Sequence, residues 1–409
     1  MTRVIHTGDT HLGYRQYHSP ERRADFLAAF EAVIEDAIAD DADAVIHAGD
    51  LFHDRQPALP DVHGAIEVLR DLRAADIPFL AVVGNHERTR DQQWLDLFST
   101  LDLAIRLGAD PTVIGDTAFY GLDFVPRSKR DDLDYEFDPH DAEHAALVSH
   151  GLFEPFPHAD WDTEELLRAS NVDFDALLLG DNHAPDRAEV GGTWVTYCGS
   201  TERADASERE ARGYNIVTFD DGVSIRRRGL DTRPFVTLDL ELSDGEGAEY
   251  VRERVREADV TDAVVIVTIE GGGGEVPAAR IEEFATERGA LLARVNDRRE
   301  FDAEEVPEVR FADPDDAVRE RLREMGPSEA ALGIDETVRD DTVADSNVRD
   351  RVTDHVRSLL DADADAFETA ADLGRDEEEE GEPRDEEEEG DEPETADDPD
   401  AQVTMEDYL

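Results

Sequence analysis

Between residues 4 and 183, five short apolar runs are each followed directly by side chains that can bind a metal ion. The runs have the length and composition of buried β-strands. The segments that follow them are Gly8-Asp9-Thr10-His11, Gly49-Asp50-Leu51-Phe52-His53, Gly84-Asn85-His86-Glu87, His150-Gly151 and Gly180-Asp181-Asn182-His183. Because α/β sheets hold functional side chains beyond the carboxyl ends of their strands, we expect the five loops to converge along one sheet edge.

The donor atoms in these loops are imidazole nitrogens and carboxylate or amide oxygens. Two divalent ions ~3.5 to 4 Å apart need a bridging carboxylate, further His, Asn or Asp ligands, and open positions for water and a substrate phosphate. Each residue alone would be interpreted as a turn or capping residue, but the repeated pattern favours a two-metal site. The lack of thiolate ligands suits Mn²⁺ or a similar first-row ion better than a structural zinc.

Strand-like runs alternate with amphipathic stretches as far as about residue 230, which predicts a layered α/β domain over residues 1–232. Its further strands are expected at 194–197, 216–219 and 223–226, and its helices at 22–38, 62–72 and 94–101. Residues 233–312 begin with a strict apolar alternation and predict a small α/β capping domain. Its elements are expected to be a strand at 236–242, a helix at 250–258, a strand at 264–269, a helix from 277 and a strand at 291–295.

The C-terminal part of the chain divides into two segments by composition. Residues 313–370 predict a helical segment, with one apolar face formed by Val348, Val352, Val356, Leu359 and Leu360. This face needs a partner, which is either the capping domain or another protein. Residues 371–409 predict a disordered acidic tail, because from 376 onward there are 19 acidic residues against one arginine and very few apolar side chains.

The chain of 409 residues has a formal net charge of −63, and Lys129 is its only lysine. This pattern indicates a halophilic protein, because in molar salt the Debye length falls to ~3 Å and a dense carboxylate surface repels itself little. An acidic chain would ordinarily argue against a nucleic-acid partner. At high salt, phosphate contacts would instead come from local arginines, backbone amides and metal ions. The candidate arginines are Arg15, Arg55, Arg88 and Arg203.

Cys198 is the single cysteine, which rules out an intrachain disulfide and a cysteine-rich zinc site. No run of ~18 apolar residues predicts a membrane span, and the N-terminus has no apolar signal segment. We therefore expect a cytoplasmic protein without a membrane partner.

The order of the five motifs resembles the signature of the calcineurin-like metallophosphoesterases. Within that superfamily, the chain resembles the Mre-eleven/SbcD family of DNA double-strand-break-repair nucleases, of haloarchaeal type. The resemblance is carried by Gly13-Tyr14-Arg15 through Phe26, by the Gly49 to His53 block and by Tyr197-Cys198-Gly199-Ser200-Thr201. It covers residues 1–230 strongly, and 231–300 only by architecture.

The resemblance implies a role for each candidate site residue. One ion would be bound by Asp9, His11, Asp50 and His183, and the other by Asp50, Asn85, His150 and Asp181. His86 would be the catalytic residue that stabilises the transition state or protonates the leaving oxygen. His53 is either a contact to these residues or to phosphate, or a structural histidine. The family usually has histidine where this chain has Asp181, and a carboxylate there would shift the site toward harder ions.

The resemblance also implies an activity and partners. We expect a Mn²⁺-dependent exonuclease on duplex ends and endonuclease on single strands, acting in repair at the nucleoid with a Rad-fifty/SbcC-type ATPase. The capping domain would bind DNA, the apolar face in 348–360 is a candidate for docking the ATPase, and helices 62–72 and 94–101 would form a homodimer. Two alternatives stay open: a scaffold that tethers DNA ends with secondary or lost nuclease activity, and a phosphoesterase for small substrates.

Overall fold

The structure is a computed structural model that describes residues 1–90, 92–299 and the single positions 328, 331, 334, 352 and 356. The chain divides into two units, Met1–Glu305 and Val306–Leu409. The fold below concerns the first of them. The helical segment predicted at 313–370 and the acidic tail predicted at 371–409 lie outside the described residues, apart from those single positions.

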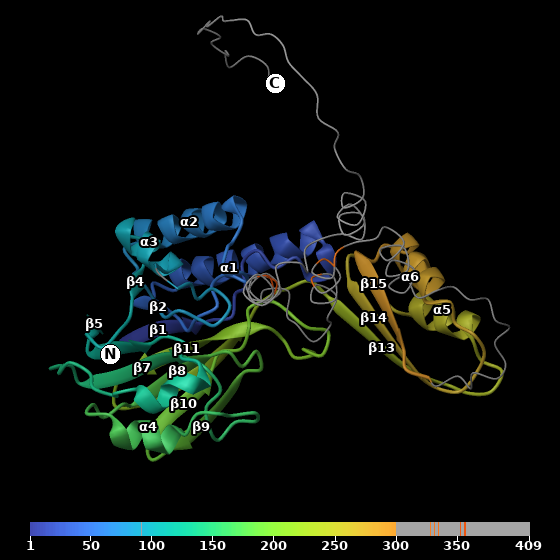
Figure 1. The fold of residues 1–409 in the computed structure, drawn as a ribbon. Coiled ribbons are helices and arrows are strands. Elements are labelled where there is room, and N and C mark those ends of the chain that lie inside the picture. The colour runs from blue at the N-terminus through green and yellow to red at the C-terminus, as the bar shows by residue number, and fades with distance from the viewer. Residues whose placement is uncertain are drawn as a thin grey trace, which may run out of the picture. The chain divides into compact units, whose positions relative to one another are not determined.

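The first of three sheets contains six strands. In spatial order they are β12 (Val223–Gly229), β11 (Gly213–Phe219), β1 (Thr2–Thr7), β2 (Ala44–His47), β3 (Phe79–Ala81) and β4 (Ile105–Arg106). Strands β1 to β4 are parallel, and β11 joins β1 antiparallel. Helices α1 (Pro20–Ala39), α2 (Leu59–Ala74) and α3 (Trp94–Thr100) cover one face of this sheet (Figure 1).

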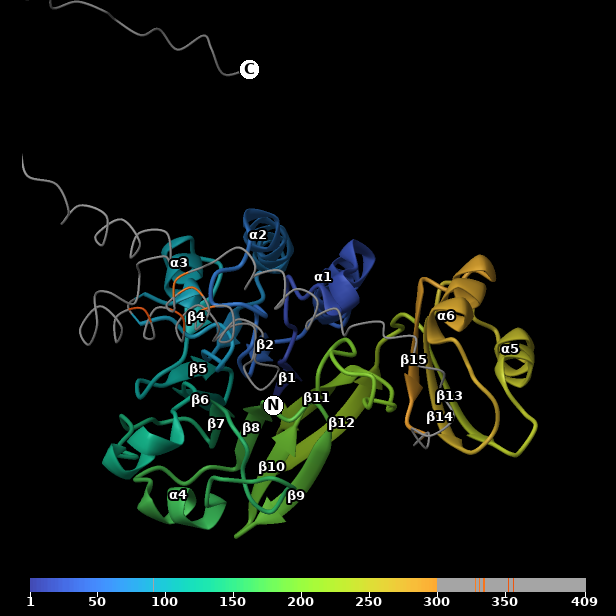
Figure 2. The same cartoon turned by 45° about the vertical axis from the view of Figure 1, so that its right-hand side comes forward.

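The second sheet also contains six strands. In spatial order they are β5 (Thr112–Ile114), β6 (Thr117–Leu122), β7 (His144–His150), β8 (Ala176–Gly180), β10 (Thr193–Tyr197) and β9 (Asp186–Val190). Strands β6, β7, β8 and β10 are parallel. Helix α4 (Thr163–Ala169) lies on the outer face of this sheet, as Figure 2 shows.

The two sheets pack face to face through a largely apolar core that also holds buried polar side chains, among them Asn215 of β11, whose amide donates to the Tyr197 carbonyl oxygen of β10 at 3.2 Å. Val4, Ile46 and Leu80 of the first sheet belong to the same buried cluster as Val148 and Leu178 of the second. A strand that is covered on both faces needs continuous apolar sequence, which explains the short apolar runs. The layered α/β fold predicted from the sequence is confirmed, with helices outside and two sheets inside.

Helix α1 shows how local sequence sets these elements. Ser19 caps it by accepting a hydrogen bond from the backbone N–H of Arg22 at 3.2 Å, and Pro20 occupies its first position. Phe30, Val33 and other apolar residues at helical spacing are buried against the sheet. The predictions for α1, α2 and α3 are correct to within three residues at each end.

The capping segment forms a third sheet of three parallel strands, β13 (Phe235–Leu242), β14 (Val264–Gly271) and β15 (Leu292–Asp297). Helices α5 (Ala248–Glu257) and α6 (Ala278–Glu287) are the crossovers between them. Their buried residues Val251, Val255 and Ile281 pack on the sheet in a separate core. The five elements expected from the sequence here are confirmed.

Two expectations need correction. The five donor loops do not follow one sheet edge: three belong to β1, β2 and β3 of the first sheet and two to β7 and β8 of the second. The sequence does not show which strands pair, so it could not separate the sheets. It also missed β6, and it missed β4, β5, β9 and α4, which are short or lie at sheet edges and carry little apolar periodicity. No helix among the described residues combines the length and apolar character needed to cross a bilayer.

Candidate metal centre

The loops that follow β1, β2 and β8 meet at the ends of the two sheets. Asp9 donates its backbone N–H to the Gly49 carbonyl oxygen, and His11 donates to that of Asp50, both at 3.0 Å. The Asp181 N–H lies 3.0 and 3.1 Å from the two carboxylate oxygens of Asp9, which joins the second sheet to the first. These contacts bring the predicted donors together.

Four of the donors have backbone conformations that side-chain-bearing residues rarely adopt. The φ angles are 49° for Asp9, 44° for His11, 56° for Asp50 and 91° for Asp181. Each costs on the order of 1 to 3 kcal/mol and persists only where the surrounding contacts enforce it. Such strain gathers at functional sites, so its repetition at the predicted ligands supports a shared site.

The first donor cluster contains Asp9, His11 and His183, whose ligand atoms all lie within 4.8 Å of one another. His11 Nε2 lies 3.1 Å from His183 Nε2 and 3.8 Å from Asp50 Oδ2. Two ring nitrogens that face each other at this distance, with carboxylates beside them, are suited to share a cation.

The second donor cluster surrounds His150. Its Nε2 lies 3.0 Å from Asn85 Oδ1, 3.5 Å from Asp50 Oδ2 and 3.7 Å from Asp181 Oδ1. Its Nδ1 lies 2.8 Å from the Ala48 carbonyl oxygen and donates a hydrogen bond to it, so Nε2 is the ring atom available to a cation. Asp50 Oδ2 therefore approaches histidines of both clusters, as a bridging carboxylate must.

The centre contains buried carboxylates that need a compensating positive charge. Asp9 and His150 are fully buried, and Asp50 is almost so. Burial raises the pKa of Asp9 to about 6. Burial disfavours the charged ring of His150, but Asp50, Asp181 and Asp9 outweigh it and raise its pKa to about 9. The carboxylates thus demand positive charge, and a divalent ion fits this donor set.

His86 and His53 lie beside the clusters. His86 Nδ1 lies 2.9 Å from the His53 carbonyl oxygen and donates a hydrogen bond to it. The His53 ring stacks on Tyr14 with ring centres 3.9 Å apart, and its Nδ1 lies 3.5 Å from His11 Nδ1. Burial, and then the nearby His86, lower the pKa of His53 to about 3. The two rings and His11 form a third group of ligand-type side chains, whose ligand atoms lie within 4.8 Å of one another.

The comparisons with known proteins agree with this geometry. The sequence model of the calcineurin-like phosphoesterase family matches residues 2–219. The DNA double-strand break repair protein Mre11 of Haloferax volcanii is 65% identical over 93% of this chain and 87% of its own length. The chain belongs to the Mre11 family of calcineurin-like phosphoesterases. The resemblance inferred from the sequence is thereby confirmed.

Other members of the Mre11 family are also similar over most of this chain. The relative from Halobacterium salinarum is 61% identical over 92% of this chain and 98% of its own length. That from Methanosarcina acetivorans is 44% identical over 88% of this chain and 61% of its own length. The first two relatives are haloarchaeal, which agrees with the acidic, lysine-poor composition.

Two carboxylates that support the site of this Mre11-family chain were not assigned a role from the sequence. Glu87 is buried, and its two oxygens accept hydrogen bonds from the backbone N–H groups of Phe52 and Gly84 at 3.1 and 3.2 Å. Burial, and then the nearby Asp50, raise its pKa to about 7. Glu208 contacts His183 at 2.7 Å, although it lies outside all five motifs and no spacing signal points to it.

A groove of about 510 Å³ begins at Pro185, two residues after His183. We call it the arginine groove, because it is lined by Arg187, Arg226 and Arg227, with Asp186 as its one carboxylate. The sequence did not single out these arginines. Arg203, a candidate for phosphate contact in the sequence, donates hydrogen bonds to the backbone oxygens of Glu208 and Glu210 and to the Thr232 hydroxyl, and its phosphate contact stays a prediction. Arg15, Arg55 and Arg88 stay predictions.

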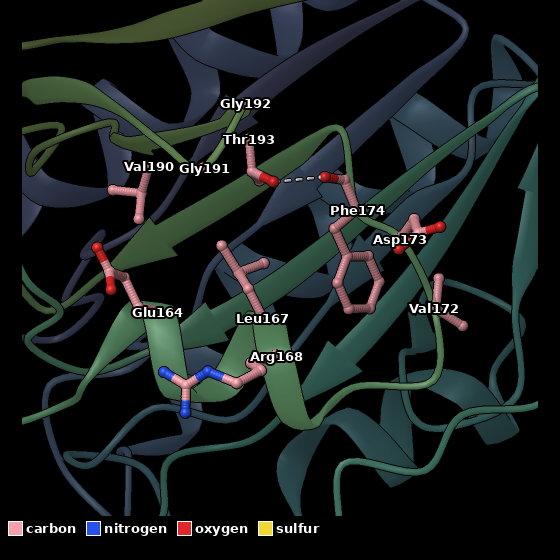
Figure 3. A pocket seen from close by; sticks show the side chains of 10 residues that line it. All are labelled: Glu164, Leu167, Arg168, Val172, Asp173, Phe174, Val190, Gly191, Gly192 and Thr193. Atoms are coloured by element: carbon pink, nitrogen blue, oxygen red, sulfur yellow. Dashed lines mark hydrogen bonds between the residues drawn. The ribbon is translucent and has the colours of Figure 1, made fainter.

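A second pocket lies elsewhere. It measures about 620 Å³ and lies between α4 and the segments that precede β8 and β10 (Figure 3). Figure 3 shows Arg168 of α4 in its lining, and the hydroxyl of Thr193 donating to the Phe174 carbonyl oxygen at 2.8 Å. The metal-ligand candidates follow the opposite ends of these parallel strands, so this pocket is separate from the centre.

Proposed function

We propose that the chain is a two-metal DNA nuclease that processes ends in double-strand-break repair. The observation that carries the proposal is the pair of buried donor clusters that share Asp50 Oδ2. The curated Mre11 relatives, which cover most of the chain, supply the repair context. Such an enzyme would act at the nucleoid.

The donor clusters support a specific division of ligands. Asp9, His11, Asp50 and His183 would hold one ion, and Asp50, Asn85, His150 and Asp181 the other. Bound divalent cations would activate a water nucleophile and neutralise charge on the phosphate. The mixture of nitrogen and oxygen donors favours Mn²⁺.

His86 is the catalytic residue of this proposal. Its Nδ1 is occupied by the His53 carbonyl oxygen, so Nε2 is the atom left to reach a phosphate oxygen. A histidine beside the cations can stabilise the charge that develops there or protonate the leaving oxygen. His53 would hold the rings of His11 and His86 in place from its stack on Tyr14.

The arginine groove supports DNA as the substrate. Three guanidinium groups around one carboxylate are a local reversal of charge in a protein of net charge −63. Guanidinium groups pair with phosphates at short range, where molar salt screens least. In this proposal residues 1–232 form the nuclease domain and 233–312 the DNA-binding capping domain.

Two partner proteins belong to the proposal. A Rad-fifty/SbcC-type ATPase would dock on the apolar face of 348–360, which lies largely outside the described residues. A second copy would pack on α2 and α3, where Leu59, Leu97 and Leu101 are 80%, 40% and 42% exposed. Exposed large apolar side chains favour association, because burying them in an interface removes apolar surface from water.

Cleavage of end-labelled duplex and single-stranded DNA in molar KCl, with Mn²⁺ or chelator, tests the proposal. Mn²⁺-dependent cleavage should be lost in Asp50→Ala and His86→Ala and kept in the exposed control His158→Ala. Metal binding without cleavage would instead indicate an end-tethering scaffold. Hydrolysis of a nucleotide monoester without cleavage of DNA would indicate a small-substrate phosphoesterase.

A further inference from the structure

Glu208 contacts a metal-ligand candidate from outside the motifs. It lies between β10 and β11, and its side chain is 12% exposed. Its Oε1 lies 2.7 Å from His183 Nδ1, a short contact of the kind that charged groups make. His183 therefore donates its Nδ1–H to a carboxylate, which leaves Nε2 facing His11 and Asp9.

The carboxylate of Glu208 is itself held in one orientation. Its Oε2 accepts hydrogen bonds from the Ala204 backbone N–H at 3.0 Å, from Arg212 at 3.1 Å and from the Ser200 hydroxyl at 3.4 Å. Arg212, which is 2% exposed, also donates to the His183 carbonyl oxygen at 3.0 Å. The His183 ring, Glu208, Arg212 and the His183 backbone thus form a closed ring of contacts.

We propose that Glu208 is a positioning residue that fixes the tautomer and rotation of His183, so that Nε2 is presented to the metal. The inference rests on the proposed function to the extent that His183 binds a metal. A carboxylate behind a ligating imidazole orients the ring and makes it a stronger donor. Glu208 does not touch the substrate or the ion.

The two donor clusters should depend on Glu208 differently. His150 has its Nδ1 fixed by the Ala48 carbonyl oxygen, a backbone group that side-chain substitution does not remove. His183 has its Nδ1 fixed by a side chain. Replacing Glu208 should therefore weaken the site of Asp9, His11 and His183 and leave that of His150 nearly unchanged.

The experiment titrates Mn²⁺ into the metal-free full-length protein in molar KCl, followed by calorimetry and by the electron paramagnetic resonance of free Mn²⁺. The variants are Glu208→Ala, Glu208→Gln and, as a control of equal charge change on the same loop, Glu210→Gln. Glu210 is exposed, and its side chain makes no hydrogen bond among the described residues. Glu208→Gln keeps the size of the side chain but has one acceptor oxygen in place of two. It therefore cannot accept from His183 on one side and from Ala204 and Arg212 on the other, so it tests the inference if Glu208→Ala does not fold.

We expect one of the two Mn²⁺ sites to weaken about 10- to 100-fold in the Glu208 variants, with both sites as in the parent for Glu210→Gln. Excess Mn²⁺ should restore the lost occupancy. Parental affinity at both sites in a folded Glu208 variant, or equal weakening of both sites, would overturn the inference. Because metal binding is measured without DNA, the result does not depend on whether the protein cleaves DNA.

Discussion

His86 donates its backbone N–H to Asp50 Oδ1 at 3.0 Å, so the proposed catalytic histidine is joined directly to the carboxylate shared by both donor clusters. Asp50 Oδ1 is thereby used within the protein, and Oδ2 is the atom that faces His11 and His150. Close packing enforces this division, because a Cβ on Gly84 would lie 2.0 Å from Asp50 Oδ1. One side chain therefore holds the His86 backbone and would also bridge the two proposed ions.

Asp50→Asn tests the bridging role of Asp50 separately from its hydrogen bond to the His86 backbone. The amide oxygen can still accept from His86, but the bridge loses its negative charge. We expect Mn²⁺ affinity to fall at both sites and DNA cleavage to drop at least about 100-fold, the scale on which transition-state charge stabilisation is lost. Mn²⁺ titration and cleavage assays measure this, with the exposed Asp221→Asn as control. Unchanged affinity at either site would contradict a bridging role.

Asp181→His restores the residue usual in the family. The site around His150 would exchange an anionic oxygen for a neutral nitrogen, which suits Mg²⁺ less than Mn²⁺. We expect Mg²⁺-supported cleavage to fall more than Mn²⁺-supported cleavage, and Asn182→His, at the next position of the same loop, to leave the ratio unchanged. An equal Mn²⁺ to Mg²⁺ activity ratio in parent and Asp181→His would show that Asp181 does not set the metal preference.

Arg187→Gln combined with Arg226→Gln tests the arginine groove. The logarithm of the DNA association constant falls linearly with the logarithm of the salt concentration. Each lost phosphate contact should make this slope less steep by about 0.7 to 0.9, so DNA affinity and its salt dependence should both decrease. Hydrolysis of bis(p-nitrophenyl) phosphate, which is too small to span the groove, should be retained. Arg168→Gln, in the separate pocket beside α4, is the matched control. DNA binding equal to that of the control would remove the groove from the substrate path.

Leu97→Asp combined with Leu101→Asp tests the proposed homodimer. Charges in a desolvated apolar contact are costly, so we expect the double variant to sediment as a monomer where the parent sediments as a dimer. Val113→Asp replaces an apolar residue of β5 that is 53% exposed, and should leave the parental state unchanged. A double variant that stays dimeric would place the interface elsewhere.

His6 should make stability fall on acidification. It is fully buried in β1, and burial lowers its pKa from 6.5 to about 3. Below pH 6.5 the unfolded chain binds a proton that the folded chain excludes, so stability declines from there until about pH 3. At pH 5.5 this costs about 1.4 kcal/mol relative to pH 7.5.

Urea unfolding of the parent and His6→Leu at both pH values measures this cost. The leucine variant should lose about 1.4 kcal/mol less than the parent between pH 7.5 and 5.5, since it has no ring to protonate. The many carboxylates titrate in both proteins, so their contribution to the pH dependence of stability drops out of the difference between parent and variant. An identical pH dependence in the two proteins would show that His6 can be protonated in the folded state.

The sequence by itself determined the kinds of donor and their places in the chain. A loop that directly follows a buried strand has little freedom, so residues such as Asn85 and His150 could be expected at strand ends from local pattern alone. The family followed from the order of the same motifs. The strands flanking these loops were predictable because both faces of each are covered by apolar side chains.

Only the tertiary structure decided how the donors meet. It assigned the loops to two sheets, because strand pairing between distant segments leaves no local signal. It placed Glu208 in contact with His183, which is 25 residues earlier in the sequence. It also placed Arg187, Arg226 and Arg227 in the lining of one groove. These relationships depend on loops whose sequence is polar and without periodicity, and whose positions are fixed by contacts with residues remote in the chain.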